Sequence, residues 1–264
     1  MVIPGASSAT QATSDDCTRR VRWQMAIAAA FLDETAAVRS IEFDIVHWKG
    51  HLAGQHVDIR LTAADGYQAQ RSYSIASPGR QGTRIEITVE KITGGEVSPF
   101  LTEEMAVGDT IELRGPIGGY FTWQPEDPSP LMLIAGGSGV VPLMSMLRTR
   151  RIACSRVPAR LLYSSRTAQD IIYRNELDSL VAHLDGFSLV HTVTRGAPAN
   201  WWGEARRVNR EMLARHVFPA AQKPLIFTCG PTSFVEVVAD QLISLGYDEK
   251  TIKTERFGPS GEKG

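Results

Sequence analysis

The sequence predicts two successive halves of different fold class, an all-β barrel followed by a doubly wound α/β domain. From about residue 20 to 123, short segments of alternating apolar and polar residues are interrupted by Gly, Pro and Asp. The segment "QPEDPSP" then places three prolines within seven residues, which ends any regular element. From residue 131 onward, compact apolar strands alternate with helical patterns. We therefore expect a flexible tail over 1–18, a barrel over 19–123, a linker over 124–130 and an α/β domain over 131–264.

Composition excludes several classes of function. The 264 residues are 43% hydrophobic, enough to bury a core, and the formal net charge is −1. This charge gives no general attraction to nucleic acid or anionic membranes. No apolar run approaches the about 18 residues of a membrane span. Cys17, Cys154 and Cys229 lack the short spacing of metal ligands, and their odd number argues against a disulfide framework, so we expect a cytoplasmic protein. His47 and His51 lie four apart in a strand context without a carboxylate cluster, so we expect no metal site.

Six segments account for the expected barrel. The run "MAIAAAFL" (25–32) is expected to be a buried strand. Five further strands are expected at "VRSIEFDIV", "HVDIRL", "RSYSIAS", "RIEITVEK" and "TIELRG". The alternation in "RIEITVEK" predicts one face in the core and one in water, with Ile85, Ile87 and Val89 inward and Glu86, Thr88 and Glu90 outward.

Four apolar segments are expected to form the parallel sheet of the second half, at 131–135, 160–164, 187–193 and 225–229. Helical stripes lie between and after them, formed by Leu177, Leu180, Val181 and Leu184 and by Val235, Val238, Leu242 and Leu245. Ser233 and Glu236 have the spacing of a capping box, which predicts the start of the second helix.

The strongest local signal is "LIAGGSGVVPLMSMLR", where an apolar strand runs through Gly136, Gly137 and Gly139 directly into a helix. Such a turn lets the backbone approach a phosphate, whose charge the free amides of the helix start attract. A plain strand-to-helix turn is the alternative. A second strand ends at Cys229 and Gly230, and both turns are expected to face one crevice at the carboxyl ends of the strands. Taken alone, Cys229 is also typical of a buried, inert cysteine.

The barrel half has a comparable feature. The segment "GGEVSPFL" (94–101) offers backbone amides beside two glycines and the hydroxyl of Ser98. It is either an anion-binding nest or a β-turn with a serine hydrogen bond. Arg71 is either a phosphate anchor or an ordinary surface arginine. The two halves can therefore hold two phosphate-bearing ligands, one each.

Taken together in this order, "RSYS", "GGEVSPFL", "GPIGGYF", "AGGSGVVPLMSMLR", "YSSRTAQDIIYRNEL", "CGPTSF" and "ERF" resemble the ferredoxin–NADP reductase superfamily over about residues 20–258. The resemblance implies a six-stranded Greek-key barrel that binds FAD, followed by a domain that binds a nicotinamide nucleotide.

The resemblance also implies roles for individual residues. Arg71 would pair with the FAD pyrophosphate, Tyr73 would lie against the flavin ring and Ser74 beside its reactive nitrogen. Ser74, Cys229 and Glu255 would be the catalytic positions, which orient a hydride while the cofactors supply the chemistry. The flavin site would comprise Arg71, Ser72, Tyr73, Ser74, Val89, Gly95, Val97, Ser98 and Phe257. The nucleotide site would comprise Gly136, Gly137, Ser138, Gly139, Ser165, Arg166, Thr194, Arg195, Gly230 and Pro231.

The choice between NADPH and NADH depends on the strand ends. Thr194 and Arg195 follow the third strand of the α/β half, where NADP-using relatives place a hydroxyl and an arginine on the 2′-phosphate, and Arg166 follows the second strand. An arginine can pair with that phosphate or stack on adenine. No acidic residue stands at either strand end to favour a bare ribose hydroxyl, so NADP is favoured while NAD stays possible.

These implications lead to an FAD-dependent NAD(P)H:acceptor oxidoreductase that is a monomer or a weak dimer. The chain contains no ferredoxin-type C-x₄-C-x₂-C motif, so the acceptor is expected to be a separate ferredoxin, cytochrome or oxygenase component. Two alternatives stay open, a flavin reductase that releases reduced flavin and a redox-inactive nucleotide-binding subunit. Seven residues follow Phe257, which leaves open whether its ring covers the flavin.

Overall fold

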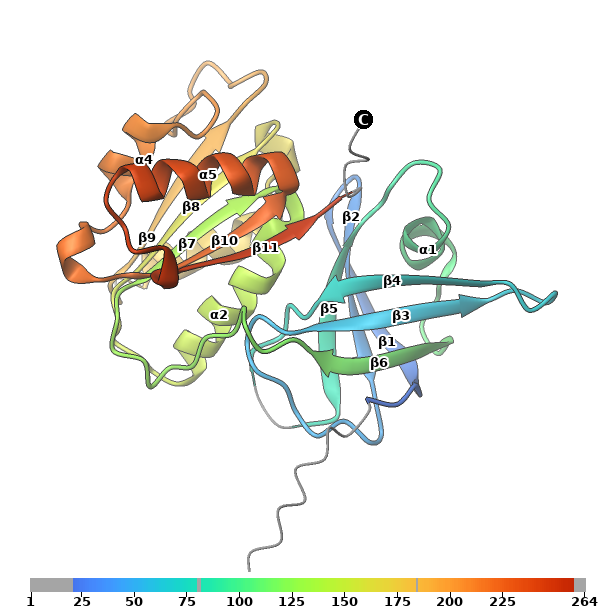
Figure 1. Ribbon diagram of the computed structural model, residues 1–264. Helices are drawn as coiled ribbons and strands as arrows, with labels where there is room; N and C mark the ends of the chain where they lie inside the picture. Colours follow the sequence, from blue (N-terminus) through green and yellow to red (C-terminus); the bar gives the residue numbers. More distant parts are fainter. Residues whose placement is uncertain (1–20, 80–81, 184, 259–264) are drawn as a thin grey trace, which may run out of the picture.

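The computed structural model describes residues 21–79, 82–183 and 185–258. Two halves lie side by side, each built around its own sheet (Figure 1). The first half contains a six-stranded antiparallel sheet and the second a five-stranded parallel sheet, which confirms the predicted fold class. None of the helices in the described ranges has both the length and the hydropathy needed to cross a bilayer. Cys17 and the whole of the expected tail, residues 1–18, lie outside these ranges.

The barrel has the strand order β4-β3-β6-β1-β2-β5. A bridge between Ile75 and Ile87 joins the end of β4 to β5, so the two edges of the sheet meet. Buried aliphatic residues from all six strands fill the interior. The elements are β1 (Gln24–Thr35), β2 (Val38–Asp44), β3 (His56–Thr62), β4 (Gln68–Ser74), β5 (Arg84–Glu90), a short helix α1 (Val97–Pro99) continued by a π-helical turn (Phe100–Glu104), and β6 (Thr110–Ile117).

The first strand is only half buried. Residues 25–32 do lie within β1, but Met25, Ile27 and Leu32 are 54%, 42% and 62% exposed. Ala26 and Ala28 alone of this stretch are buried. Because successive side chains of a strand point to opposite faces, a barrel strand turns every second residue outward even when the run is apolar. The prediction of a strand is confirmed, and the prediction that it is buried is wrong.

The second half has the strand order β11-β10-β7-β8-β9, with all neighbours parallel. The four predicted strands are present, and a fifth, β11, extends the sheet beside β10. The elements are β7 (Leu131–Gly136), a 3₁₀ turn (Gly137–Gly139), α2 (Val140–Ile152), β8 (Ala159–Ser165), a 3₁₀ turn (Ala168–Asp170), α3 (Arg174–Ala182), β9 (Phe187–Val193), α4 (Arg210–His216), a 3₁₀ turn (Ala220–Gln222), β10 (Leu225–Pro231), α5 (Thr232–Ser244), a 3₁₀ turn (Glu249–Thr251) and β11 (Ile252–Phe257).

Helices cover both faces of this sheet, as the doubly wound prediction requires. One core cluster joins α2 and α3 to Leu131, Leu133 and Leu161. The other joins α4 and α5 to Met132 and Ile134, the neighbours of those residues on β7. Successive residues of one strand therefore serve opposite layers, which explains why the strand sequences are apolar without a break.

The predicted capping box at Ser233 and Glu236 is wrong. α5 begins at Thr232, one residue before Ser233, and Pro231 is its N-cap residue. A capping side chain must come from a residue with non-helical backbone, and Ser233 is already inside the helix. Pro231, with φ −55° and ψ 145°, ends the extended chain of β10 immediately before the first helical turn.

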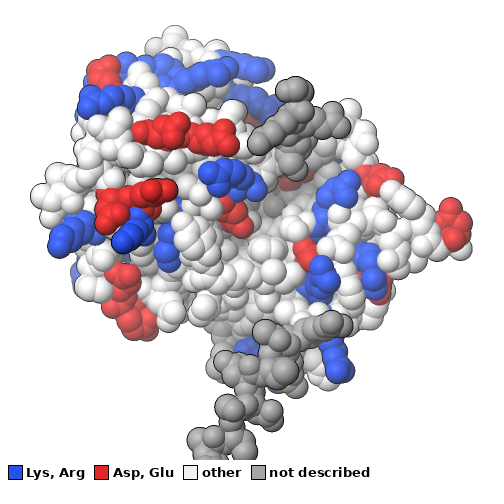
Figure 2. Space-filling view, in the orientation of Figure 1, with Lys and Arg blue, Asp and Glu red and all other residues white. Residues whose placement is uncertain are grey.

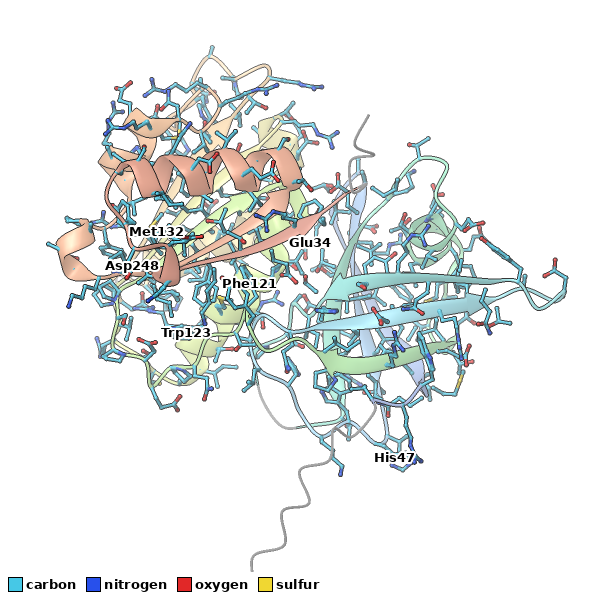
Figure 3. All side chains as sticks on the ribbon, in the orientation of Figure 1. Glu34, His47, Phe121, Trp123, Met132 and Asp248 are labelled. Carbon is cyan, nitrogen blue, oxygen red and sulfur yellow. The ribbon has the colours of Figure 1, made fainter. Side chains whose placement is uncertain are left out.

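The end of the barrel segment packs into the second half. Phe121 and Trp123 lie between the two halves beneath the α/β sheet (Figure 3). The ring of Phe121 meets that of Phe227 in β10 edge-on, with centroids 5.2 Å apart, and Trp123 is 2% exposed in the core shared with α2. These aromatic contacts fix the chain on the α/β half before the proline-rich segment begins.

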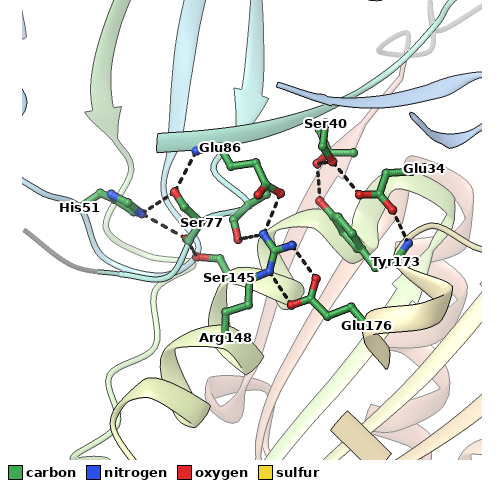
Figure 4. A network of polar contacts seen from close by, with 11 residues as sticks. Glu34, Ser40, His51, Ser77, Glu86, Ser145, Arg148, Tyr173 and Glu176 are labelled. Carbon is green, nitrogen blue, oxygen red and sulfur yellow. Dashed lines mark hydrogen bonds and ion pairs between the residues drawn. The ribbon is translucent and has the colours of Figure 1, made fainter. Parts of the chain in front are cut away.

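The outward face of β5 does not lie in water. Glu86 accepts a hydrogen bond from Arg148 of α2 at 2.7 Å (Figure 4). Thr88 is hydrogen-bonded to the Tyr173 hydroxyl. Glu90, next on the same face, reaches Ser138 at 2.8 Å. The predicted solvent face is therefore wrong, because these polar residues face the second half of the molecule. The alternation itself is confirmed, since Ile85, Ile87 and Val89 are fully buried in the barrel.

Charged residues of both signs are spread over the face shown in Figure 2, with lysines and arginines gathered along the outer edge of the α/β half. Around α4, Arg206 and Arg215 pair with Glu204 and Glu211 at 2.6–3.3 Å. These two arginines of the α/β half are thus paired with carboxylates.

Candidate functional site

Cys229 and Glu255 lie on adjacent parallel strands, β10 and β11, in direct register. The Cys229 sulfur is 4.0 Å from Glu255 Oε2. On the other side, Glu255 Oε1 is 4.0 Å from Nδ1 of His56, which begins β3 of the barrel. The three side chains therefore form a row across the junction of the two halves.

Burial controls the charges in this row. It raises the pKa of the Cys229 thiol well above its usual value, and the charge of Glu255 adds to the rise. Burial also raises the pKa of Glu255 to about 7. The pKa of His56 is lowered by burial, against the opposing charge of Asp58. At neutral pH the row thus holds a protonated thiol, a carboxyl group near its titration point and an uncharged imidazole.

Ser74 closes the row on the barrel side, because it is the antiparallel partner of His56. The end of β4 therefore brings Ser74 beside the same junction as Cys229 and Glu255. His56 is not among the residues predicted from the sequence. Its context marks only a polar residue at the start of a strand, and its pairing with Ser74 is visible in the structure alone.

Residues of "RSYS" alternate between the two faces of β4. The hydroxyl of Ser72 donates to Asp58 at 2.6 Å, and Asp58 also binds Arg114 at 2.8 Å, so Ser72 is engaged within the barrel. Arg71 is exposed, and its guanidinium donates to the neighbouring Gln70 carbonyl at 2.7 Å. Tyr73 packs against the barrel core, and its burial raises the pKa of the phenol. Only Arg71 of the four presents a charge to an incoming ligand.

The segment at 94–98 combines both structures that the sequence allowed. The Ser98 hydroxyl accepts a hydrogen bond from the Ile92 amide at 3.0 Å and so stabilises a turn. Gly94 has φ +75°, a left-handed conformation that favours glycine, and Val97 and Ser98 open the short helix α1. Ser98 is thus used by the turn itself, and the Gly95 amide donates to the Ile92 carbonyl at 2.9 Å. Of the predicted groups, this leaves the backbone amide of Val97 for an anion.

The glycine-rich turn after β7 is held tightly on one side and open on the other. A Cβ on Gly139 would lie 2.2 Å from the Cys229 carbonyl oxygen, and one on Gly230 would lie 2.8 Å from the ring of Phe234. A Cβ on Gly137, which has φ +56°, would meet nothing within 4 Å. The turns that end β7 and β10 therefore meet, as predicted, and leave open space beside the half-buried Gly137. This cradle fits a nucleotide pyrophosphate.

The ends of β8 and β9 are joined by backbone hydrogen bonds. The Arg195 amide donates to the Arg166 carbonyl at 2.7 Å, and the Thr194 amide donates to the Ser165 carbonyl at 3.1 Å. Arg166 is largely exposed. The two arginines proposed for a 2′-phosphate thus rise from one connected edge.

An acidic residue also reaches this edge, and no sequence motif marks it. Glu90 accepts a hydrogen bond from the Ser138 hydroxyl at 2.8 Å, and its second oxygen lies 3.4 Å from the Arg166 guanidinium. It comes from the barrel, some fifty residues before the glycine-rich turn in sequence, which is why inspection of the strand ends alone missed it.

Phe257 ends β11 opposite Pro231 and packs partly against the core of the α/β half. Gly258 is the last described residue, so the segment that follows lies outside the described ranges. No group of three or more His, Cys, Asp or Glu side chains suited to a metal ion occurs within the described ranges.

Comparison with known proteins accounts for this arrangement. Residues 34–122 match the oxidoreductase FAD-binding domain, and residues 133–240 match the oxidoreductase NAD-binding domain. A ferredoxin–NADP reductase B from Sorangium cellulosum is 34% identical over 227 residues, which are 83% of this chain and 91% of that protein. The chain belongs to the ferredoxin–NADP reductase superfamily.

Other members of this superfamily are similar over most of the chain. The reductase subunit of a glycine betaine monooxygenase from Pseudomonas aeruginosa is 32% identical over 78% of this chain, and the chain spans only 56% of that protein. The FAD/NAD-binding domain of a nitric oxide dioxygenase from Vibrio cholerae has the same fold, with a TM-score of 0.78, 24% identity and coverage of 89% of this chain and 99% of that one. Because the two family models match the two halves of this chain, FAD and a nicotinamide nucleotide are the cofactors of its two domains.

Proposed function

We propose that the protein takes a hydride from a nicotinamide nucleotide, NADPH in preference to NADH, onto FAD and passes electrons to a separate acceptor protein. The observation that carries the proposal is the row of His56, Glu255 and Cys229, which spans the junction between the FAD-binding and NAD-binding domains. FAD supplies the chemistry, since it accepts electrons as a pair and returns them singly.

Each half contributes binding groups of its own. Arg71 and the Val97 amide hold the pyrophosphate of the flavin, and the turn at 136–139 holds that of the nucleotide. Ser74 and Tyr73 border the flavin, and Gly230 and Pro231 border the nicotinamide. The side chain of Val89 is fully buried in the barrel core, so it contributes packing only. Cys229 and Gly230 are buried at the domain junction, which limits the access of water to the place where the hydride moves.

The row orients the reacting groups and leaves covalent chemistry to the cofactors. Cys229 is 2% exposed and protonated at neutral pH, so it acts as a neutral hydrogen-bond donor and packing surface, without the thiolate that a nucleophile needs. Glu255, with a pKa of about 7, can hold or release a proton at the working pH. His56 connects this carboxyl group to the strand that carries Ser74.

NADPH is favoured by the connected edge of Arg166, Thr194 and Arg195, which offers two guanidinium groups and a hydroxyl to a 2′-phosphate. The names of the relatives support the choice of acceptor. They include the reductase subunit of a monooxygenase, the electron transfer component of a dioxygenase and a ferredoxin–NADP reductase. We propose that the acceptor is an oxygenase component or a ferredoxin. The reductase itself is a monomer or a weak dimer and acts in the cytoplasm.

An anaerobic titration of the purified protein tests the proposal. The flavin absorbance of the wild-type protein should bleach with NADPH faster than with NADH, and the Ser74→Ala variant should stay yellow but bleach at least about tenfold more slowly. Failure of both nucleotides to reduce the flavin would leave only a redox-inactive nucleotide-binding role. Release of the reduced flavin through an ultrafiltration membrane would instead identify a flavin reductase.

A further inference from the structure

Among the described residues, Glu90 is the acidic residue whose side chain contacts two parts of the proposed nucleotide site, the glycine-rich turn and Arg166. It ends β5 in the barrel and crosses the domain junction, where Ser138 of the glycine-rich turn donates to Oε2 at 2.8 Å. Its Oε1 lies 3.4 Å from the guanidinium of Arg166. The side chain is 27% exposed, while that of Arg166 is 69% exposed.

This position sets Glu90 against the charge of a bound nucleotide. The turn at Ser138 is the proposed cradle of the pyrophosphate, so a carboxylate hydrogen-bonded to it repels the phosphates of NADH and NADPH alike. The contact with Arg166 acts differently on the two nucleotides. Only NADPH carries a 2′-phosphate, and an arginine already paired with a carboxylate has less positive charge to offer it.

We propose that Glu90 is a specificity-determining residue, which competes with the 2′-phosphate of the nucleotide for Arg166 and so reduces the preference for NADPH over NADH. The inference rests on the proposed function and extends it, because it predicts a moderated preference in which both nucleotides are used. The Arg195 amide donates to the Arg166 carbonyl, so the two arginines belong to one edge. The arginine charge that pairs with Glu90 therefore lies in the edge that would recognise the 2′-phosphate.

The test measures binding of two fragments that lack nicotinamide, ADP-ribose and 2′-phospho-ADP-ribose, to the FAD-loaded protein by titration calorimetry. Glu90→Gln keeps an acceptor for Ser138 and removes the charge. Its affinity for 2′-phospho-ADP-ribose relative to ADP-ribose should rise about threefold or more, within the range of an exposed ion pair. The shift should shrink as salt is raised, because exposed charges are screened.

A matched control removes the same charge elsewhere. Glu112 on β6 also pairs with an arginine, Arg60 at 2.6 Å, and its side chain is 31% exposed. Glu112→Gln should leave the affinity ratio unchanged, which separates the local effect from that of net charge. An equal shift in the control would overturn the proposal.

A double-mutant cycle tests the route through Arg166. In an Arg166→Gln background, Glu90→Gln should no longer change the affinity ratio. An unchanged ratio in the single variant, or a shift that persists without Arg166, would overturn the proposal. A wild-type protein whose FAD neither nucleotide reduces would refute the proposed function instead, while the fragment affinities would still report on Glu90.

Discussion

Arg148 Nη1 of α2 lies 2.7 Å from Glu86 Oε1 of β5, so a largely buried ion pair joins the nucleotide-binding half to the barrel. The same guanidinium binds Glu176 at 2.6 Å and the Ala76 carbonyl at 3.0 Å. Ala76 lies two residues beyond Ser74, and α2 begins directly after the glycine-rich turn. One side chain therefore connects the segments that carry both proposed cofactor sites (Figure 4).

Arg148→Met should destabilise the protein by about 3 kcal/mol, because it leaves the Glu86 carboxylate largely buried without its partner. Burial already raises the pKa of Glu86, and Arg148 opposes that rise. Urea unfolding of the variant measures the loss. Arg39→Met is the control, since Arg39 pairs with an exposed Asp33 and its loss should cost no more than about 1 kcal/mol. Equal losses in the two variants would show that the junction does not depend on this pair.

Glu255 should give the reductase a pH dependence near neutrality. Its pKa is raised to about 7 in the folded state, so the rate of flavin reduction should change with an apparent pKa close to 7. Stopped-flow reduction between pH 6 and pH 8 measures this, and Glu255→Gln should show a flat profile over that range. A profile with the same apparent pKa in the variant would assign the titration to another group.

The same shift predicts a sign for stability. A carboxyl group whose pKa is higher when folded stabilises the protein at low pH, below its unfolded pKa, and this contribution is lost as pH rises through about 7. The free energy of unfolding of wild type minus that of Glu255→Gln should therefore fall between pH 5 and pH 8. A difference that rises with pH would contradict the burial of Glu255.

Gly139→Ala should damage the glycine-rich turn, because its Cβ would meet the Cys229 carbonyl oxygen at 2.2 Å. We expect a loss of stability of about 2 kcal/mol and at least tenfold weaker binding of ADP-ribose. Thermal unfolding and calorimetry measure the two effects. Gly119→Ala, where a Cβ meets nothing within 4 Å, should change neither, and equal damage at both positions would exclude close packing as the cause.

Most of the fold could be predicted from the sequence, because the patterns that predict it are local. Alternation over Ile85–Val89 and the unbroken apolar strands around Leu133 each follow from one element and the faces it must bury. The domain junction does not follow from any single element. Strand periodicity shows that Glu86 and Thr88 lie on the outer face of the barrel. It does not show whether that face meets water or residues of the other half, such as Arg148 and Tyr173.

The residues of the candidate site divide in the same way. The glycine-rich turn, Cys229 and Ser74 stand at recognisable strand ends, so the motifs located them. His56 and Glu90 carry no motif, since each is an ordinary polar residue at the end of a barrel strand. Their relevance arises only from contacts with Glu255, Ser138 and Arg166, which are all distant in sequence.

The two faces of β5 have a consequence for engineered chimeras. One face completes the barrel through Ile85, Ile87 and Val89, and the other contacts the α/β half through Glu86, Thr88 and Glu90. Exchange of the nucleotide-binding half with that of another reductase at the proline-rich segment would thus leave the contacts made by β5 behind. A functional exchange has to include alternate residues of a strand that lies some forty residues upstream of the apparent boundary.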